Sequence, residues 1–334
     1  MLVFGGGYDT CEDTDSQTRC TTTPRKGANI WFVDADTGTI LRIYPTNYSV
    51  PGEITLLTDA SGYATYAYAA DTGGYVYRIN MGTYDGTTFG STWTNNSAAA
   101  NITIANLSET GQARKFLFGP DVIVYPGFNA VTIGSGDREH PLSNSYACNN
   151  FTSGVQNQFF MLKDRPTAYP SPAITPTNLT DVTTNLAATA SDINTYGWRF
   201  NLVDPATLTF RCEQTVNKAL TIGGVTYFGS NGPKSASETS NSCGSNLGNA
   251  RGYAVDFLTG APVSTNGSRY AIYNYGGLPP SPVGGIVDID GTKVPFCIGC
   301  TTPGDTNPSP LQGSPITINP SGARQRVYWY LETD

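Results

Sequence analysis

The chain has 334 residues, of which 39% are hydrophobic and 13% charged, and its net charge is −7. This apolar content suffices for a large core, which excludes a disordered chain. The acidic balance excludes a cationic groove for nucleic acid. No run of about 18 apolar residues is present, so we predict no membrane-spanning helix. Helical periodicity is absent as well, which indicates an all-β protein.

Short β-prone runs follow one another along the whole chain. Many alternate apolar and polar residues and are bounded by Gly, Asn or Asp, as is typical of strands joined by tight turns. We predict strands at Met1–Phe4, Ile30–Val33, Ile40–Tyr44, Tyr66–Ala70, Tyr75–Ile79, Lys115–Phe118, Val122–Tyr125, Ala130–Ile133, Phe159–Leu162, Gly197–Leu202, Ala219–Ile222, Val225–Phe228, Tyr253–Phe257, Val283–Ile289, Thr292–Cys297 and Val327–Leu331. Hairpin turns are predicted at Thr72–Gly74, Pro126–Gly127, Gly223–Gly224 and Asp290–Gly291.

One strand-turn-strand unit occurs twice. GANIWFVDADTGTIL begins at Gly27 and NARGYAVDFLTGAPV at Asn249, so that Asp34 aligns with Asp256. An Asp side chain bonds the backbone two residues on, and Gly supplies positive φ at no steric cost. A repeated unit of this kind is typical of a radial β array, above all a β-propeller. We therefore predict a single propeller domain over residues 1–334.

Longer polar segments indicate surface loops, and the cysteines indicate the redox compartment of the chain. Segments near 86–108, 167–194, 234–249 and 301–320 are rich in Thr, Asn, Ser or Pro, and we predict surface loops there. Seven cysteines in a Lys-poor chain favour an oxidising compartment. We predict the pairs Cys11–Cys20, Cys212–Cys243 and Cys297–Cys300, which leaves Cys148 over. Connectivity cannot be deduced from spacing alone. The opening MLVFGGGYD lacks a basic region, so no signal peptide is predicted at this start.

Distinctive segments follow one another along the chain: LVFGGGYDT with ANIWFVDADTGTIL, YATYAYAADTGGYVYRIN, RKFLFGPDVIVYPGFNAVTIGSGDREHPL, NQFFMLKDRP, GWRFNLVDP, KALTIGGVTYFGSNGP, RGYAVDFLTG, GGLPPSPVGG and RVYWYLE. In this order they resemble the C-terminal β-propeller of the PilY/PilC family of type IV pilus tip proteins. The resemblance spans nearly the whole chain and implies a propeller of four-stranded antiparallel blades. The family's propeller is longer, so this chain resembles its later blades. We expect exposed strand edges unless a further chain or segment completes the ring, or the ring closes differently.

The family's calcium loop is degenerate in this chain. Family members often carry Asp-x-Asp-x-Asp-x-x-x-Asp before the Tyr-x-Tyr-Ala strand. The four ligand positions of that pattern fall on Leu57, Asp59, Ser61 and Thr65, so one carboxylate remains. Calcium affinity depends on ligand charge, so we expect a β-turn around Ser61–Gly62 and no bound cofactor or metal.

Other candidate residues also favour structural roles. The loop Glu12–Asp15 holds three carboxylates, and we expect it to be solvated and tied by a disulfide. His140 is the single histidine, and without a G-x-S-x-G elbow we expect a turn residue. Cys297–Cys300 lacks the following His of a haem site and sits in loop sequence, which favours a structural disulfide. The aromatic residues are expected to pack within sheets rather than to form an adhesive surface; they include Tyr253, Tyr270, Tyr273, Tyr275 and Trp329.

The resemblance implies a non-enzymatic protein that acts at the pilus tip in assembly and surface adhesion. It implies export through the periplasm to the cell surface, with minor pilins or the tip complex as partners and an unidentified receptor. Two alternatives stay open: a propeller enzyme such as a quinoprotein-like oxidoreductase, and a structural subunit of an extracellular filament. The lack of a catalytic or metal constellation favours the first hypothesis over the enzyme, because fold alone does not decide function.

Overall fold

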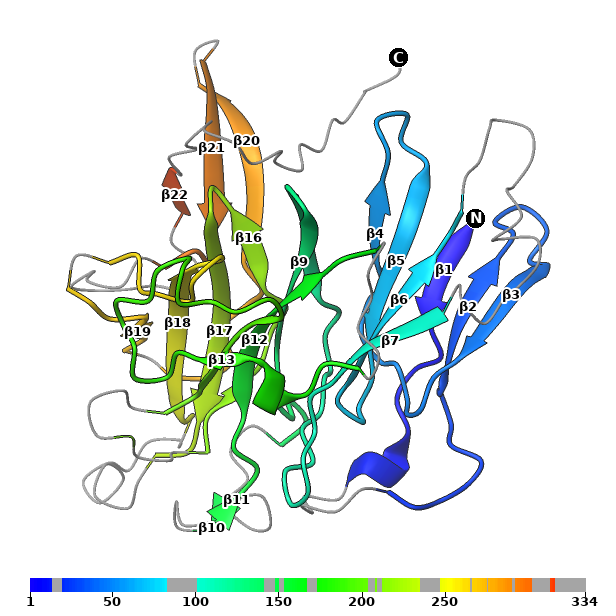
Figure 1. The fold of residues 1–334 in the computed structure, drawn as a ribbon, viewed down its shortest axis with the longest axis horizontal. Helices are drawn as coiled ribbons and strands as arrows, with labels where there is room; N and C mark the ends of the chain where they lie inside the picture. The colour runs from blue at the N-terminus through cyan, green and yellow to red at the C-terminus, as the bar shows by residue number, and fades with distance from the viewer. Residues whose placement is uncertain are drawn as a thin grey trace.

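The computed structural model describes residues 1–13, 20–82, 101–140, 148–149, 153–166, 173–203, 208, 212–234, 247–264, 266–274, 276–289, 292–301 and 313–315. The fold is all-β, as predicted, and its strands form five larger sheets that stand side by side (Figure 1). Two 3₁₀ turns, η1 (Thr10–Asp13) and η2 (Pro176–Asn178), are the helical elements of these residues. Within the described ranges, no helix is long and apolar enough to cross a membrane.

We number the five sheets as blades in chain order. Blade 1 has the order β1 (Leu2–Gly5), β2 (Asn29–Val33), β3 (Ile40–Pro45). Blade 2 has the order β4 (Thr55–Thr58), β5 (Ala64–Ala70), β6 (Tyr75–Asn80), β7 (Asn101–Asn106). Blade 3 has the order β13 (Thr180–Asp181), β14 (Gly197–Asn201), β12 (Gln158–Asp164), β9 (Phe128–Gly134), β8 (Asp121–Tyr125).

Blade 4 has the order β15 (Gln214–Thr215), β17 (Val225–Gly232), β18 (Asn249–Asp256), β19 (Tyr270–Ile272), with β16 (Leu220–Ile222) also paired to β17. Blade 5 has the order β20 (Val283–Ile289), β21 (Thr292–Ile298), β22 (Gly313–Pro315). A ribbon of β10 (Cys148–Asn149) and β11 (Ser153–Gly154) stands apart from the blades. The blades thus hold three to five described strands rather than a uniform four.

The first strands of successive blades meet along one axis. β4 contacts β8, β8 contacts β16, and β16 contacts β20. This is the inner ring expected of a propeller, in which each blade begins at the centre and runs outward. In blade 1, β1 pairs with β2 and no described strand lies on its other side. The inner position of blade 1 is therefore open among the described strands.

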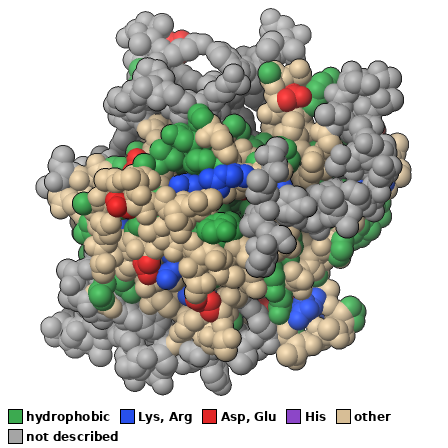
Figure 2. All heavy atoms as spheres, viewed as in Figure 1, with side chains coloured by type: hydrophobic (Ala, Val, Ile, Leu, Met, Phe, Trp, Pro, Cys, Tyr) green, Lys and Arg blue, Asp and Glu red, His purple; other side chains and the backbone are tan. Residues whose placement is uncertain are grey.

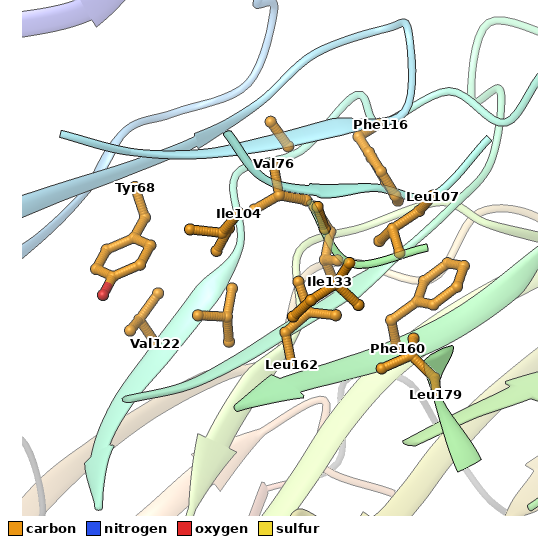
Figure 3. Packing of buried hydrophobic residues seen from close by; sticks show 14 of the residues in the cluster. Tyr68, Val76, Ile104, Leu107, Phe116, Val122, Ile133, Phe160, Leu162 and Leu179 are labelled. Carbon is orange, nitrogen blue, oxygen red and sulfur yellow. The ribbon is translucent and has the colours of Figure 1, made fainter. Parts of the chain in front are cut away.

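Apolar layers fill the spaces between consecutive blades. Between blades 1 and 2, Phe32 and Tyr44 pack over the alanines of β5, because small side chains let the two sheets approach closely. Between blades 2 and 3, Tyr68, Val76 and Phe160 belong to one buried apolar layer, which Figure 3 shows. Each of these five side chains is at most 3% exposed.

An aromatic stack joins blades 3 and 4. The ring of Phe159 lies 3.9 Å from that of Phe228 and nearly parallel to it, at an interplanar angle of 8°. Phe228 stacks in turn on Tyr253 at 4.5 Å, and Trp198 stacks on Phe200 at 5.7 Å. Such pairs contribute roughly 0.5–1.5 kcal/mol each beyond their buried area. This aromatic stack lies within the apolar layer between the two blades.

Some predictions of local structure were wrong. Lys115–Phe118 is not a strand, because Lys115 is held by an ion pair and Phe116 turns into the core between blades 2 and 3. The predicted loop 86–108 ends in a strand, β7, whose alternating Asn-Ile-Thr-Ile pattern extends the sheet of blade 2. The predicted loop 167–194 carries η2 and β13, and Val182 within it is fully buried.

The predicted hairpin turns at Thr72–Gly74, Pro126–Gly127 and Gly223–Gly224 are confirmed, since antiparallel strands flank each of them. The predicted turn at Asp290–Gly291 and the predicted strand at Val327–Leu331 lie outside the described residues.

The repeated Asp-x-x-Thr-Gly motif adopts one geometry in both copies. Asp34 Oδ1 accepts hydrogen bonds from the backbone N–H groups two and three residues on, at 3.0 and 2.8 Å. Asp256 Oδ1 does the same at 3.0 and 2.9 Å. Gly38 and Gly260 close the turns with φ of 72° and 68°. The carboxylates in these motifs therefore fix hairpins.

Alanine at the two turn glycines should separate backbone strain from crowding. A Cβ at Gly38 meets nothing within 4 Å, so Gly38→Ala should cost only the left-handed backbone strain of roughly 1–2 kcal/mol. A Cβ at Gly260 lies 3.0 Å from the Trp198 ring, which adds about 1–3 kcal/mol of overpacking. Urea unfolding of both variants measures the difference, and equal losses would contradict the expected crowding.

Candidate functional site

At one end of the blades, several connections between strands converge. We call this end the loop face and define it by residues 6–28, 107–120, 135–157 and 202–219, excluding those outside the described ranges. Figure 1 shows η1 and the β10–β11 ribbon at this end, below the strands. The opposite end carries short turns such as Asp59–Tyr63 and Pro126–Gly127, and also the connection 165–196, which leaves β12 and returns to β14 beside the Pro126–Gly127 turn. Loops on a rigid scaffold are the usual place for binding residues.

A buried lysine ties the loop face together. Lys115 is 7% exposed, and its Nζ donates to the carbonyl oxygen of Glu12 and, at 2.5 Å, to Asp137 Oδ2. His140 Nδ1 lies 3.6 Å from the same carboxylate oxygen. Gln214 accepts from the Asp137 N–H at 2.6 Å and donates to the His140 carbonyl at 2.9 Å. We call these five residues the Lys115 cluster; it joins blades 1, 3 and 4.

The bonds of this cluster hold segments of several blades together. Tyr8 lies beside it, and burial, together with the charges of Asp137 and Asp13, raises the pKa of its phenol, which stays neutral. A charge-assisted bond inside a buried network rigidifies the segments it joins. Glu12 was predicted in a solvated loop, which is wrong because this residue is 3% exposed. His140 was predicted as a turn residue, which its N–H bond to the Asp137 carbonyl confirms. Lys115 and Gln214 were missed, because nothing in the sequence near them signals that they converge.

Two disulfides within the described residues differ in their surroundings. Cys11, within η1, is bonded to Cys20, which precedes β2. Cys297–Cys300 is sealed between blades 4 and 5, with exposures of 0% and 3%. Thiol–disulfide exchange needs access for an attacking thiolate, so the buried pair is suited to a structural role. Cys212 is also disulfide-bonded, and its predicted partner Cys243 lies outside the described residues.

The degenerate calcium loop forms a hairpin. Asp59 Oδ1 accepts from the N–H groups of Ser61 and Tyr63 at 2.8 and 3.0 Å. Leu57 is buried in the core, and the Thr65 hydroxyl donates to its carbonyl oxygen at 3.2 Å. Across the described parts of the chain, no three His, Cys, Asp or Glu side chains come together as metal ligands. The turn expected at Ser61–Gly62 is thus present.

The aromatic candidates that the structure describes are largely internal. Tyr253 is 2% and Tyr273 is 4% exposed, and Tyr270 packs against the ring of Tyr253 at 5.3 Å. Tyr275 and Trp329 lie outside the described residues.

Charged groups at the axis bind one another. Lys218, which precedes β16, lies 3.2 Å from Glu53, which precedes β4. The N–H of Gly119, before β8, donates to the second oxygen of Glu53 at 3.1 Å. Burial alone would raise the pKa of Glu53, but Lys218 and the Gly119 N–H hold it below its ordinary value. Figure 2 shows a band of Lys and Arg side chains near the middle of one face, with acidic groups scattered around it.

Two further ion pairs are buried within the blades. Arg78 of β6 binds Asp164 of β12 at 2.5 Å, and both side chains are at most 2% exposed. Arg251 of β18 binds Glu213, which also accepts from Tyr253 Oη at 2.7 Å. Burial first, and then the Glu213 charge, raise the pKa of Tyr253, so this phenol acts as a donor. These acids and bases are committed to one another and to the fold.

A quinone cofactor would need free acidic, basic and calcium-ligating groups around the axis. Glu53 is engaged by Lys218 and Gly119, and Asp121 Oδ2 accepts from the Thr221 N–H at 2.6 Å. Both carboxylates are engaged by the inner strands, and we derive no chemical step through such a group.

Asp71 should make stability depend on pH. Burial raises its pKa to about 6, although it accepts bonds from Tyr75, Tyr77, Tyr48 and Gly73. The folded state then binds more protons than the unfolded state between pH of about 4 and 6, so this group adds stability as pH falls through that window. Asp71→Asn removes the titration. The free energy of unfolding of wild type, relative to this variant, should therefore rise by about 2 kcal/mol from pH 7 to pH 4.5. Urea titrations of both proteins at both pH values measure this difference in the free energy of unfolding. A difference that stays the same at pH 7 and pH 4.5 would contradict the prediction.

Comparisons with known proteins support the fold. No protein-family model matches the sequence, and a search of curated proteins finds no match. The C-terminal domain of PilY1 from Pseudomonas aeruginosa aligns with a TM-score of 0.55 and 14% identity, over 85% of this chain and 67% of that domain. Two quinohemoprotein alcohol dehydrogenases align with TM-scores of 0.42. That from Pseudomonas putida HK5 is 12% identical, over 83% of this chain and 36% of its own. That from Comamonas testosteroni is 13% identical, over 87% and 42%. The chain therefore has a PilY1-like β-propeller fold.

Proposed function

We propose that this protein is a non-enzymatic β-propeller of the PilY/PilC kind that works at or near the tip of a type IV pilus. It would act in pilus assembly and in adhesion to surfaces. The observation that carries the proposal is the structural match to the PilY1 C-terminal domain over 85% of the chain. Segment resemblances such as the Gly-rich strand before Asp137 point the same way.

The mechanism is rigid display of the loop face. Apolar layers hold each blade against the next, so the strands form a stiff base. The Lys115 cluster and the Cys11–Cys20 disulfide fix the connections that emerge from it. Preorganised loops bind a partner at a lower entropy cost. Disulfides persist in oxidising surroundings, which suits export through the periplasm to the cell surface.

The partners that fit this role are minor pilins or the pilus tip complex, and a surface receptor whose identity is open. An acidic chain with a net charge of −7 favours protein or glycan surfaces over nucleic acid. Engagement of the axial acids with Lys218 and with backbone N–H groups favours a non-enzymatic role over the quinoprotein alternative.

Deletion and complementation in the native host test the proposal. Loss of the gene should reduce sheared surface pili and cell adhesion, and the tagged wild-type protein should label filament ends in immunogold microscopy. Lys115→Met should restore less adhesion than wild type because it releases the loop face. Lys26→Met, at an exposed lysine of the same face, is the control.

Normal piliation and adhesion in the deletion strain would contradict a pilus role. Oxidation of alcohols by the purified protein with added quinone cofactor and calcium would instead support the enzyme. Label distributed along the filaments rather than at their ends would favour the structural subunit.

A further inference from the structure

The outward face of blade 1 is apolar across all three strands. Antiparallel pairing places side chains of β1, β2 and β3 in two rows on this face. The rows are Phe4–Trp31–Ile43 and Leu2–Val33–Ile40. Leu2 and Ile40 are each 53% exposed, and Phe4 is 46% exposed. We call these six residues the blade 1 end face.

The outward face of blade 5 has the same character. Cys297 of β21 points toward blade 4, so its neighbours in the strand point away from it. Val283 pairs directly with Ile298, and they are 63% and 44% exposed. Phe296 and Val294 continue this side of the sheet and are half-buried. We call these four residues the blade 5 end face.

Two-sided apolar sheets are expected only where both sides are covered. An antiparallel sheet with one solvated side normally alternates apolar and polar residues. Blades 2, 3 and 4 are apolar on both sides because each is covered by two neighbours. Blades 1 and 5 have the same pattern but one described neighbour each. The exposed apolar residues on their other faces are typical of contact surfaces.

The inner contacts of the chain indicate what fits these faces. We call the side of a blade that faces the preceding blade in the chain its leading side, and the side that faces the following blade its trailing side. Every internal layer joins the trailing side of one blade to the leading side of the next. Among the described residues, the blade 1 end face is the free leading side and the blade 5 end face the free trailing side. Figure 1 shows these two sheets well apart, with the other blades between them, so they do not cover one another within one chain.

We propose that the blade 1 end face of one molecule binds the blade 5 end face of a second copy of this chain, head to tail. The contact continues the blade-to-blade packing across two molecules. It goes beyond the proposed pilus role and does not rest on it. Because the two surfaces differ, the contact is heterologous, and it leads either to a closed ring or to a growing chain.

Sedimentation equilibrium of the purified chain between about 1 and 100 μM tests the proposal, a range that brackets common self-association constants. The average mass should rise with concentration. Phe4→Ser and Val283→Ser should each weaken association at least tenfold. Ile272→Ser is the matched control, since Ile272 is 52% exposed but lies on β19, outside both end faces. Circular dichroism confirms that each variant is folded.

Mixing the two face variants gives the sharpest outcome. The Phe4→Ser chain keeps its blade 5 end face, and the Val283→Ser chain keeps its blade 1 end face. Together they should form a one-to-one dimer that grows no further, although each alone associates at least tenfold more weakly than wild type. A wild-type monomer at every concentration, or association unaffected by Val283→Ser, would overturn the proposal. Neither result bears on pilus localisation, so the two proposals fail separately.

Discussion

Replacing Asp164 with asparagine should lower the free energy of unfolding by about 3–5 kcal/mol, because it leaves the Arg78 guanidinium buried without a countercharge. The pair is 2.5 Å long, with side-chain exposures of 2% and 0%. Asp164 also accepts from Tyr68 Oη at 2.7 Å, and Asn129 donates to the same phenol oxygen at 2.8 Å. The substitution therefore disturbs a four-residue network that joins blade 2 to blade 3.

An exposed ion pair supplies the control for this variant. Asp181 lies 3.0 Å from Arg199, but its side chain is 43% exposed. Exposed pairs typically contribute 0–1 kcal/mol, so Asp181→Asn should cost about that much. Urea unfolding followed by circular dichroism measures both. Equal losses would mean that burial of the Arg78–Asp164 pair is unimportant.

The double variant Arg78→Met/Asp164→Leu separates the charge from the packing. Replacement of a buried pair by apolar side chains is often neutral, so the double variant should be more stable than Asp164→Asn alone. A double variant that is less stable than the single one would show that the hydrogen bonds to Tyr68 and Pro166, rather than the unpaired charge, carry the effect.

Local patterns in the sequence predicted the parts of the fold that local physics determines. The Asp-x-x-Thr-Gly turns were visible because Asp and Gly serve the turn geometry at fixed positions. Most strands were visible because alternation marks a sheet. β7 was missed because its Asn and Thr residues resemble the polar segment before it. The prediction of a strand at Lys115–Phe118 was wrong because this β-prone run forms the connection between blades 2 and 3.

The candidate site was predictable only in pieces. Glu12 and His140 are far apart in sequence, and only the ring of blades brings them to Lys115. Arg78 and Asp164 are separated by 86 residues, and no local pattern pairs them. The apolar end faces could not be predicted from the sequence for a different reason. The sequence shows that a strand is apolar on both sides, but which side is exposed depends on the neighbouring sheet. The family resemblance predicted exposed strand edges unless a further chain or segment completes the ring, or the ring closes differently, but the residues of the end faces required the register of the strands.

Phe159→Ala should be the most damaging apolar substitution, with an expected loss of about 3–5 kcal/mol. Phe159 is fully buried in β12, and three aromatic rings surround it, with centroids 3.9 Å (Phe228), 6.0 Å (Phe200) and 6.2 Å (Trp198) away. Truncation leaves a cavity that stiff rings on two blades cannot collapse into. Phe159→Leu keeps most of the volume and should cost less, chiefly the loss of stacking.

Phe4→Ala is the matched control, because Phe4 is 46% exposed on the blade 1 end face. Its effect on the unfolding of a single chain should stay within about 0.5 kcal/mol. Urea unfolding at low protein concentration keeps association out of the measurement. If Phe159→Ala cost no more than Phe4→Ala, blades 3 and 4 would not be joined by the aromatic stack. If both were costly, the blade 1 end face would already be covered in the single chain, and the head-to-tail contact would lose its basis.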